Sequence, residues 1–165
     1  MYSGDWPLPN KDYSSTRAAT SSTISSSNIN SLKAVWSYAI PGGAASNPLI
    51  FGDTVYFQDL NSNIVALSIK NGSAIWTKRY DLPVLGPNGV AVGFGKVFAA
   101  AGYYRFVALD ASSGRELWSI NLSNKDTVGI TIQPRFMMGW SIYPQKQGAP
   151  LAAQIPLDPE AYCMP

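Results

Sequence analysis

Short apolar runs alternate with turn-forming residues through the middle of this chain, and the pattern occurs twice. Residues 107–118 hold an apolar run, a turn that closes on Gly, and a second run that ends on Trp118. Residues 65–76 place Val, Ala, Leu, Gly and Trp at identical offsets, 42 positions earlier, and Trp36 extends the series backwards. Each copy predicts a strand, a tight turn and another strand. The chain therefore repeats one β-structural unit.

Each copy forms the second half of a longer unit with four predicted strands. The first unit has apolar runs at 47–51, 54–58 and 64–69 before the Trp76 strand, and the second has runs at 90–92, 97–100 and 106–110 before the Trp118 strand. Four strands joined by short loops, with a period of about 40 to 50 residues, are typical of β-propeller blades. We therefore predict an all-β chain, a partial β-propeller of about two four-stranded antiparallel blades.

The residues before the first unit have little apolar periodicity. Ser and Thr dominate from Ser14 to Ser27, which predicts a solvated arm or an extended strap. Asn28 is a candidate cap for a single helical turn. Residues 34–40 alternate around Trp36 and predict a strand of the final blade of a closed ring, without the rest of that blade in this chain. The predicted units are 1–45 (strap and Trp strand), 46–85 (first blade), 86–134 (second blade) and 135–165 (tail).

Particular residue types at the turns and strand ends have physical roles. Gly72 and Gly114 stand where a short hairpin needs positive φ. Asp110 can accept hydrogen bonds from the next backbone amides, and Ser68 can do so more weakly in the earlier copy. Each Trp is expected to pack against the adjacent blade, which is worth roughly 3–5 kcal/mol relative to Ala.

Composition excludes several classes of function. Apolar residues make up 46% and charged residues 13% of the 165 positions, which indicates a globular chain. A net charge of +2 does not indicate nucleic acid or an acidic membrane as a partner. The absence of His removes the commonest general base and transition-metal ligand, and the single Cys163 allows no internal disulfide. No apolar run is long enough to span a membrane, and the first residues lack the pattern of a signal peptide. We predict no catalytic residue and no metal ligand.

Two stretches carry a family resemblance. The pattern Ala-Leu-Asp-x-x-x-Gly-x-x-x-Trp at 108–118, and more loosely at 66–76, resembles the tryptophan-docking repeat of pyrroloquinoline quinone (PQQ) propellers. Asp5-Trp6-Pro7, with the stretches at 12–17 and 28–32, resembles the N-terminal strap of quinoprotein alcohol and polyvinyl-alcohol dehydrogenases. The resemblance covers residues 5 to about 134. It implies a periplasmic or extracellular ring of about eight blades, with PQQ and calcium on its axis, of which this chain is an N-terminal fragment partnered by the remaining blades.

The enzyme site of that family does not carry over residue by residue. Quinoprotein alcohol dehydrogenases have a Glu near the start of the first inner strand, whereas residues 44–48 contain no acid. They also have a vicinal Cys pair at the next inner strand, where residues 90–93 contain no sulfur. The resemblance implies that calcium ligands and the catalytic Asp come from later blades. We therefore expect no PQQ or calcium bound by this chain alone and no alcohol oxidation by it.

Polar residues remain on the face that the resemblance places toward the ring axis. They are candidate cofactor contacts, and the alternative is that they cap strand ends and satisfy loop backbone. The set comprises Ser46, Asn47, Asn88, Asp59, Asn61 and Asn63. Outer-membrane assembly lipoproteins have similar repeats without enzymatic activity, so a non-enzymatic propeller for protein binding or assembly is the alternative function.

The repeat pattern ends near Pro134, and we interpret the tail as out of frame. Joining the last base of each codon to the first two of the next turns Met137-Met138 into Asp and Met138-Gly139 into Gly. That hidden Gly lies 43 positions after Gly95, which itself lies 43 positions after Gly52. We therefore expect an irregular tail over 135–165. Two blades also leave unpaired strand edges, which favour aggregation or self-association.

Overall fold

The computed structural model describes residues 4–44, 46–84, 88–122, 129–130, 133–137, 140–143 and 153–156. Within these ranges the one helical element is the 3-10 turn η1 (Ile29–Ser31), and all other regular structure is β. The first sheet contains β1 (Leu49–Phe51), β2 (Thr54–Gln58), β3 (Ile64–Ser68) and β4 (Ala74–Lys78). The second contains β5 (Ala91–Gly93), β6 (Lys96–Ala101), β7 (Arg105–Asp110) and β8 (Glu116–Asn121). The prediction of two four-stranded antiparallel units is confirmed.

Both sheets are meanders with the same register. The strand order is β1-β2-β3-β4 in one and β5-β6-β7-β8 in the other. Trp76 lies opposite Ala66, and Trp118 lies opposite Ala108. Each sheet also has a register shift directly after that pair, between Ala66 and Leu67 and between Ala108 and Leu109. The sequence repeat is therefore a repeat of backbone geometry.

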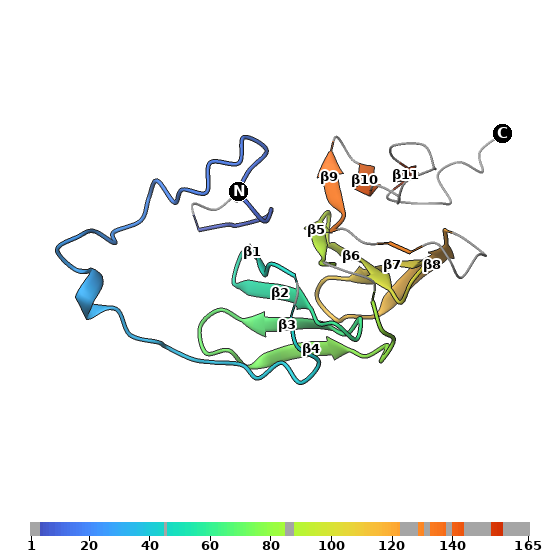
Figure 1. The fold of residues 1–165 in the computed structure, drawn as a ribbon, viewed down its shortest axis with the longest axis horizontal. Coiled ribbons are helices and arrows are strands. Elements are labelled where there is room, and N and C mark those ends of the chain that lie inside the picture. The colour runs from blue at the N-terminus through green and yellow to red at the C-terminus, as the bar shows by residue number, and fades with distance from the viewer. Residues whose placement is uncertain are drawn as a thin grey trace.

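The two sheets pack face to face over an apolar core. Tyr56, Ala66 and Trp76 of the first sheet meet Val97 and Val107 of the second in one buried cluster. Because side chains alternate across a strand, Val55, Phe57, Val65 and Leu67 point to the opposite face of the first sheet. That face is covered by Trp36, Tyr38 and Ile40 of the N-terminal arm, here defined as residues 13–44. Arm, first sheet and second sheet thus form successive layers (Figure 1).

The arm leaves the sheets, passes through η1 and returns along the first sheet (Figure 1). Its residues from 13 to 35 are exposed, as expected for a solvated strap. The predicted strand at 34–40 is wrong, because this segment is extended but pairs with no strand within the described ranges. A strand is defined by backbone hydrogen bonds to a neighbouring strand, and within the described ranges this segment pairs with none. Asn28 makes no capping bond to η1 either, because its Oδ1 accepts from the Ser25 amide.

Before the arm, the chain is attached to the inner edge of the first sheet. Trp6 and Ile50 exchange two backbone hydrogen bonds, of 2.9 and 3.0 Å. The Asp5 carboxylate also accepts from the amide of Gly52, at 2.9 Å. Residues near the chain start therefore add a bridge to the edge of β1.

The tail contains regular backbone where the sequence predicts irregular structure. A third sheet has the order β11-β10-β9, from β9 (Arg135–Met137), β10 (Trp140–Tyr143) and β11 (Ala153–Pro156). β9 lies beside β5, as β5 lies beside β1, so it holds the place of a third inner strand. β10 is rich in Trp, Ile and Tyr, which favour strands, and four residues are too few to show a clear alternation. The expectation of an irregular tail is wrong for these three segments, while the out-of-frame origin stays a prediction.

Candidate functional site: the tryptophan seams and the polar strand ends

Trp76 joins the two sheets by packing and by one hydrogen bond. Its Nε1 donates to the carbonyl of Ala111 at 2.9 Å. The indole lies over Gly114, so a Cβ at that position would stand 2.6 Å from a ring atom. Gly114 also has φ of +69°, which other residues rarely adopt. One glycine thus provides both the turn and the surface on which the indole lies.

Trp36 repeats this geometry on the first sheet. Its Nε1 donates to the carbonyl of Ile69 at 2.8 Å, and a Cβ on Gly72 would stand 2.6 Å from its ring. Ile69 and Gly72 are the positions that correspond to Ala111 and Gly114 in the repeat. Trp36 of the arm therefore packs on the first sheet in the same way as Trp76 of the first sheet packs on the second.

Trp118 is the third member of the series and lacks the hydrogen bond. Its ring contacts those of Phe98 and Phe106, with centroids 5.8 and 6.3 Å away. Its Nε1 is buried and has no acceptor among the described residues. A buried donor without a partner costs about 1–3 kcal/mol. Within the described ranges, Trp118 is therefore the member of the series whose indole N–H is buried without an acceptor.

The turns beneath Trp76 and Trp36 differ in chemistry. Asp110 accepts from the amides and the hydroxyls of Ser112 and Ser113, all on its Oδ1. The bond from the Ser112 hydroxyl, followed by those from Ser113, lowers the pKa of this exposed carboxyl to about 2. Ser68 accepts one longer bond of 3.3 Å, from the amide of Lys70, as expected for a weaker turn former.

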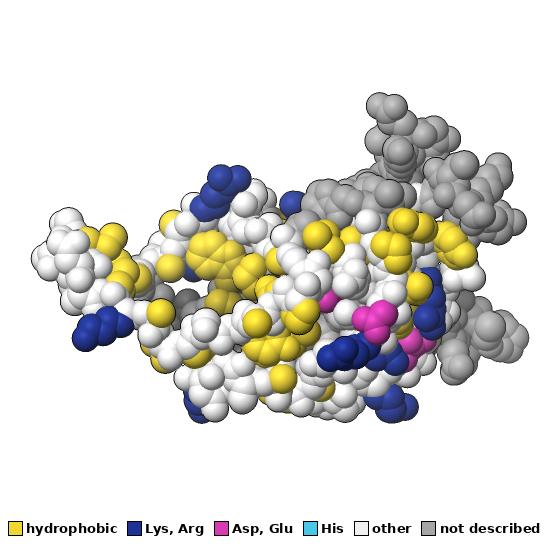
Figure 2. All heavy atoms as spheres, turned by 60° about the horizontal axis from the view of Figure 1, so that its bottom comes forward, with side chains coloured by type: hydrophobic (Ala, Val, Ile, Leu, Met, Phe, Trp, Pro, Cys, Tyr) yellow, Lys and Arg dark blue, Asp and Glu magenta, His cyan; other side chains and the backbone are white. Residues whose placement is uncertain are grey.

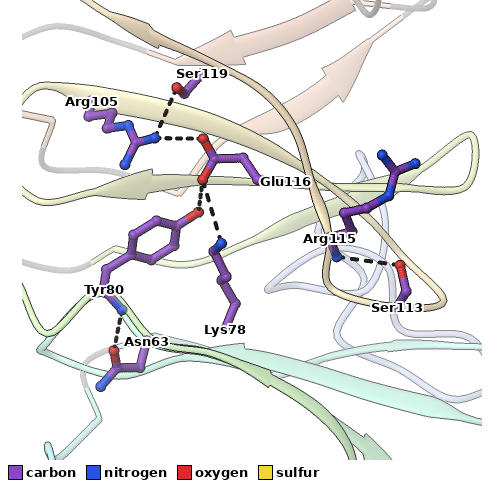
Figure 3. A network of polar contacts seen from close by, with 8 residues as sticks. All are labelled: Asn63, Lys78, Tyr80, Arg105, Ser113, Arg115, Glu116 and Ser119. Carbon is purple, nitrogen blue, oxygen red and sulfur yellow. Dashed lines mark hydrogen bonds and ion pairs between the residues drawn. The ribbon is translucent and has the colours of Figure 1, made fainter.

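A polar network crosses the same seam (Figure 3). Glu116 of β8 accepts from the Tyr80 hydroxyl at 3.0 Å, pairs with Arg105 of β7 and lies 3.8 Å from the Lys78 Nζ. Burial, and then the hydrogen bond to Glu116, raise the pKa of Tyr80. Lys78 and Tyr80 come from the end of the first sheet, so Glu116 holds the two sheets together at their rim. Sequence reasoning missed this network, because its members are up to 38 positions apart and carry no common motif.

The candidate polar residues all lie at one end of the sheets. Ser46 and Asn47 precede β1, Asn88 precedes β5, and Asp59 and Asn61 follow β2, which is the same end in an antiparallel meander. A pocket of about 190 Å³ opens there between the arm and the first sheet. It is lined by Asp59, Asn61, Asn63, Arg79 and Asp81, with arm and strand residues behind them.

The candidate residues that form hydrogen bonds form most of them within their own blade. Asp59 Oδ1 accepts from the amides of Asn61 and Asn63 at 2.9 and 2.8 Å, which closes the β2–β3 loop. The Ser46 hydroxyl donates to the Gln58 carbonyl at 2.6 Å. Asn47 and Asn61 are exposed. These contacts match the role of strand-end capping that the sequence left open.

Asn88 is different, because it is buried, with 4% of its surface exposed, and neither Oδ1 nor Nδ2 has a partner among the described residues. A single amide does not make a cofactor site, however. In the described ranges no group of three or more His, Cys, Asp or Glu side chains could hold a metal ion. The carboxylate of Asp59 already accepts hydrogen bonds from two loop amides. The described residues therefore do not supply a cluster of acidic ligands for calcium, and we derive no chemical step from them.

Two four-stranded meanders joined by a docked Trp define consecutive blades of a β-propeller. The chain belongs to the PQQ-repeat family whose model, described as outer membrane protein assembly factor BamB, matches residues 13–136. No helix in the described ranges is long and apolar enough to cross a membrane.

Individual relatives point to quinoprotein enzymes. The quinohemoprotein alcohol dehydrogenase of Comamonas testosteroni is 31% identical over 150 residues, which is 82% of this chain and 21% of that protein. Its crystal structure covers 86% of this chain with a TM-score of 0.77 at 29% identity, and 23% of the dehydrogenase is matched. BamB from Moraxella catarrhalis shares the fold, with a TM-score of 0.56 at 18% identity over 68% of this chain and 38% of BamB. The chain thus spans about a fifth of the length of the curated dehydrogenases it matches.

Proposed function

We propose that this chain is a partial propeller of the quinoprotein dehydrogenase lineage and that its role is structural: it supplies two blades and the arm that meets the first of them. The observation that carries this proposal is the equivalence of Trp36 and Trp76. Both indoles lie on a turn glycine and donate to the carbonyl three residues before it. A segment that mimics the Trp strand of a preceding blade is what a closed ring requires of its first residues.

In the intact protein of this lineage we expect PQQ and calcium on the ring axis, held by groups from many blades. The two blades of this chain contribute few of them, because 44–48 and 90–93 lack the acid and the Cys pair of the family. We therefore propose that the chain alone binds neither group. Ser46, Asn47, Asn88, Asp59 and Asn61 remain candidate contacts for the cofactor of the complete ring. Asn88 is the best supported of them, because its buried amide has no partner in the part of the chain that the structure describes.

The test is reconstitution of the purified chain with PQQ and calcium, followed by dye-linked oxidation of a primary alcohol. We expect no turnover above a no-protein control, because oxidation needs a positioned base beside a polarised quinone. Binding of PQQ is measured separately by its absorbance after gel filtration, so that loss of activity is not confused with loss of binding. PQQ-dependent turnover by the chain would contradict the proposal.

A non-enzymatic propeller for protein binding or assembly is the second candidate. The description of the matching family model and the fold of BamB favour it, as do the missing acid and Cys pair. The DNA that follows the coding region distinguishes the two candidates. Later blades with clustered carboxylates and a catalytic Asp would indicate a dehydrogenase, and blades without them would indicate a binding protein. For either candidate we propose a periplasmic or extracellular location, the remaining blades as partners, and self-association through open edges.

A further inference from the structure

The turn on which Trp36 lies contains an Asn-Gly pair. Asn71 precedes Gly72 here. The equivalent position in the turn beneath Trp76 is Ser113. An Asn followed by Gly can react with itself, because the Gly nitrogen is held close to the side-chain amide carbon and no Cβ hinders its approach. Of the two Trp turns, the one that holds the arm therefore contains the reactive pair.

We propose that Asn71 is a site of spontaneous deamidation and that the docked arm slows the reaction. The backbone nitrogen of Gly72 gives its proton to hydroxide and bonds to the side-chain carbonyl carbon of Asn71, and ammonia leaves. Water then opens the resulting imide at either of its carbonyls. One product is aspartate on an ordinary backbone, and the other is isoaspartate, whose main chain runs through the former side chain. No oxidant, reductant or cofactor takes part.

The side chain of Asn71 is exposed and already polarised for this attack. Its Oδ1 accepts from the amide of Ser73 at 3.0 Å and from the Ser73 hydroxyl at 2.8 Å. Negative charge develops on this oxygen as the carbon is attacked, and donors that are already aimed at it stabilise that charge. Because both donors come from only two residues away, this contact can persist when the rest of the turn opens.

Docking of the arm restrains the other reactant. The N–H of Gly72 donates to the carbonyl of Ser68 at 2.9 Å, so the turn must open locally before this nitrogen reaches the side chain. Trp36 lies on Gly72 and donates to the carbonyl of Ile69 in the same turn, which opposes that opening. Coupling of this kind is reciprocal. Isoaspartate lengthens the main chain between Ile69 and Gly72, so the modified turn should hold Trp36 less well.

The arm depends on few contacts. Its apolar contacts with the first sheet come from Trp36, Tyr38 and Ile40, and its residues from 13 to 35 are exposed. The stretch around η1 projects from the rest of the molecule (Figure 2). A change in the single turn beneath Trp36 therefore acts on a large part of what holds the arm.

A second Asn-Gly pair in the same chain serves as an internal control. Asn88 precedes Gly89, and 4% of the surface of Asn88 is exposed. A Cβ on Gly89 would stand 2.7 Å from the side chain of Gln133, so this backbone is enclosed as well. The dipeptide is the same, but water and hydroxide reach it only through a larger opening of the fold. We therefore expect Asn88 to react much more slowly than Asn71.

The experiment follows both Asn residues in one sample of the full chain, kept in mildly alkaline buffer. Trypsin cuts after Lys and Arg, so the peptides 71–78 and 80–96 each contain one of the two residues and no other Asn. Mass spectrometry of these peptides measures the conversion of amide to carboxylate over time, and a digest of freshly purified chain sets the starting value. Asn71 should react about tenfold faster or more than Asn88, with isoaspartate among its products.

Two variants separate docking from chemistry. Trp36→Ala should raise the rate at Asn71 about threefold to tenfold, toward that of a synthetic peptide of residues 65–78. Ser73→Ala should lower the rate about threefold, in the chain and in the peptide, because one donor to Oδ1 is lost. If circular dichroism shows that Trp36→Ala does not fold, Tyr38→Ala replaces it, since it weakens the packing of the arm without changing the turn.

The isoaspartate form, separated by ion exchange, tests the effect on the arm. Hydrogen exchange of the Trp36 indole N–H, followed by NMR and assigned by its loss in Trp36→Phe, should become about tenfold faster. Asn71→Asp adds the same charge on an ordinary backbone and should stay close to wild type. Equal rates at Asn71 and Asn88, or a product without isoaspartate, would overturn the assignment of the site. An unchanged rate at Asn71 in a folded arm variant would overturn the role of docking. None of these readouts involves PQQ, so they are independent of the proposed function.

Discussion

Trp76 and Trp118 occupy the same place in two successive blades, yet only Trp76 completes its contact among the described residues. Both lie opposite an Ala in the neighbouring strand and directly before the same register shift. Trp76 donates to Ala111 and lies on Gly114, whereas the buried N–H of Trp118 has no acceptor within the described ranges. The sequence motif places the donor, but the acceptor belongs to the next repeat along the chain. A blade of this family is therefore finished only by its neighbour.

The largest expected change in stability comes from supplying the blade that would follow Trp118. Restoring the shifted frame at about codon 134 should regenerate a strand, an Asp-Gly turn and a further strand of the Ala-Leu type. Trp118 would then gain an acceptor, and the chain should become more resistant to urea, with stronger protection of its Trp fluorescence from quenchers. The gene itself is the first measurement, because stop codons in the shifted frame would rule out this origin of the tail.

Truncation of the docked indole should have the next largest effect. Trp76→Ala should lower the free energy of unfolding by about 3–5 kcal/mol, because it removes a buried aromatic group between two sheets. Trp118→Ala should cost less, about 1–2 kcal/mol, since its ring is covered on fewer sides. Urea unfolding followed by circular dichroism measures both, and equal losses would contradict the comparison.

Phe at the same two positions isolates the hydrogen bond from the packing. Trp76→Phe should cost about 1–3 kcal/mol, because the carbonyl of Ala111 loses its donor. Trp118→Phe should be neutral or slightly stabilising, since it deletes a buried N–H that has no acceptor among the described residues. A loss of the same size in both variants would show that Trp118 has an acceptor after all.

Two glycines with the same backbone conformation, only one of which lies beneath the Trp76 indole, form a matched pair. Gly114 and Gly95 have nearly equal φ, +69° and +70°, but a Cβ on Gly114 would meet Trp76 at 2.6 Å while one on Gly95 would meet nothing within 4 Å. Gly95→Ala should cost about 1 kcal/mol for backbone conformation alone. Gly114→Ala should cost about 1–3 kcal/mol more, because the overpacked ring must move. Thermal unfolding of the two variants checks the difference.

The smallest effect concerns the two turns. The pKa of Asp110 is about 2 in the folded chain, below the ordinary value of 3.8, so its contribution to stability is present above about pH 4 and is lost as the pH falls toward 2. Asp110→Ser makes the second turn like that of Ser68 and should remove this part of the acid dependence. Urea midpoints of the two proteins between pH 5 and 2 should converge at low pH. A constant difference across this range would show that the carboxylate is not the cause.

Features that depend on nearby residues could be predicted from the sequence. The four strands of each blade, the glycines of positive φ and the Asp110 turn all follow from patterns within a few residues. The prediction of a strand at 34–40 failed, because the apolar alternation is real but the segment pairs with no strand within the described ranges. The three strands of the tail were missed for the opposite reason, since backbone pairing formed where no alternation was visible.

Whether the contacts of the candidate site could be predicted also depends on how far apart their residues lie in the sequence. Asp59 binds amides two and four positions later, a local turn that the sequence could place but not distinguish from a cofactor contact. Glu116 meets Tyr80 across 36 positions, and no residue pattern marks that meeting.

Local patterns are enough to show that this protein is built from repeated β units, because period, turn glycines and strand propensity act on the backbone within a few residues. Long-range contacts, in contrast, establish which Trp has an acceptor within the described ranges, that Trp36 packs on the first sheet as Trp76 packs on the second, and that Glu116 connects two sheets. Those outcomes depend on which surfaces lie against one another, and an indole N–H is satisfied only when another part of the fold brings it a carbonyl.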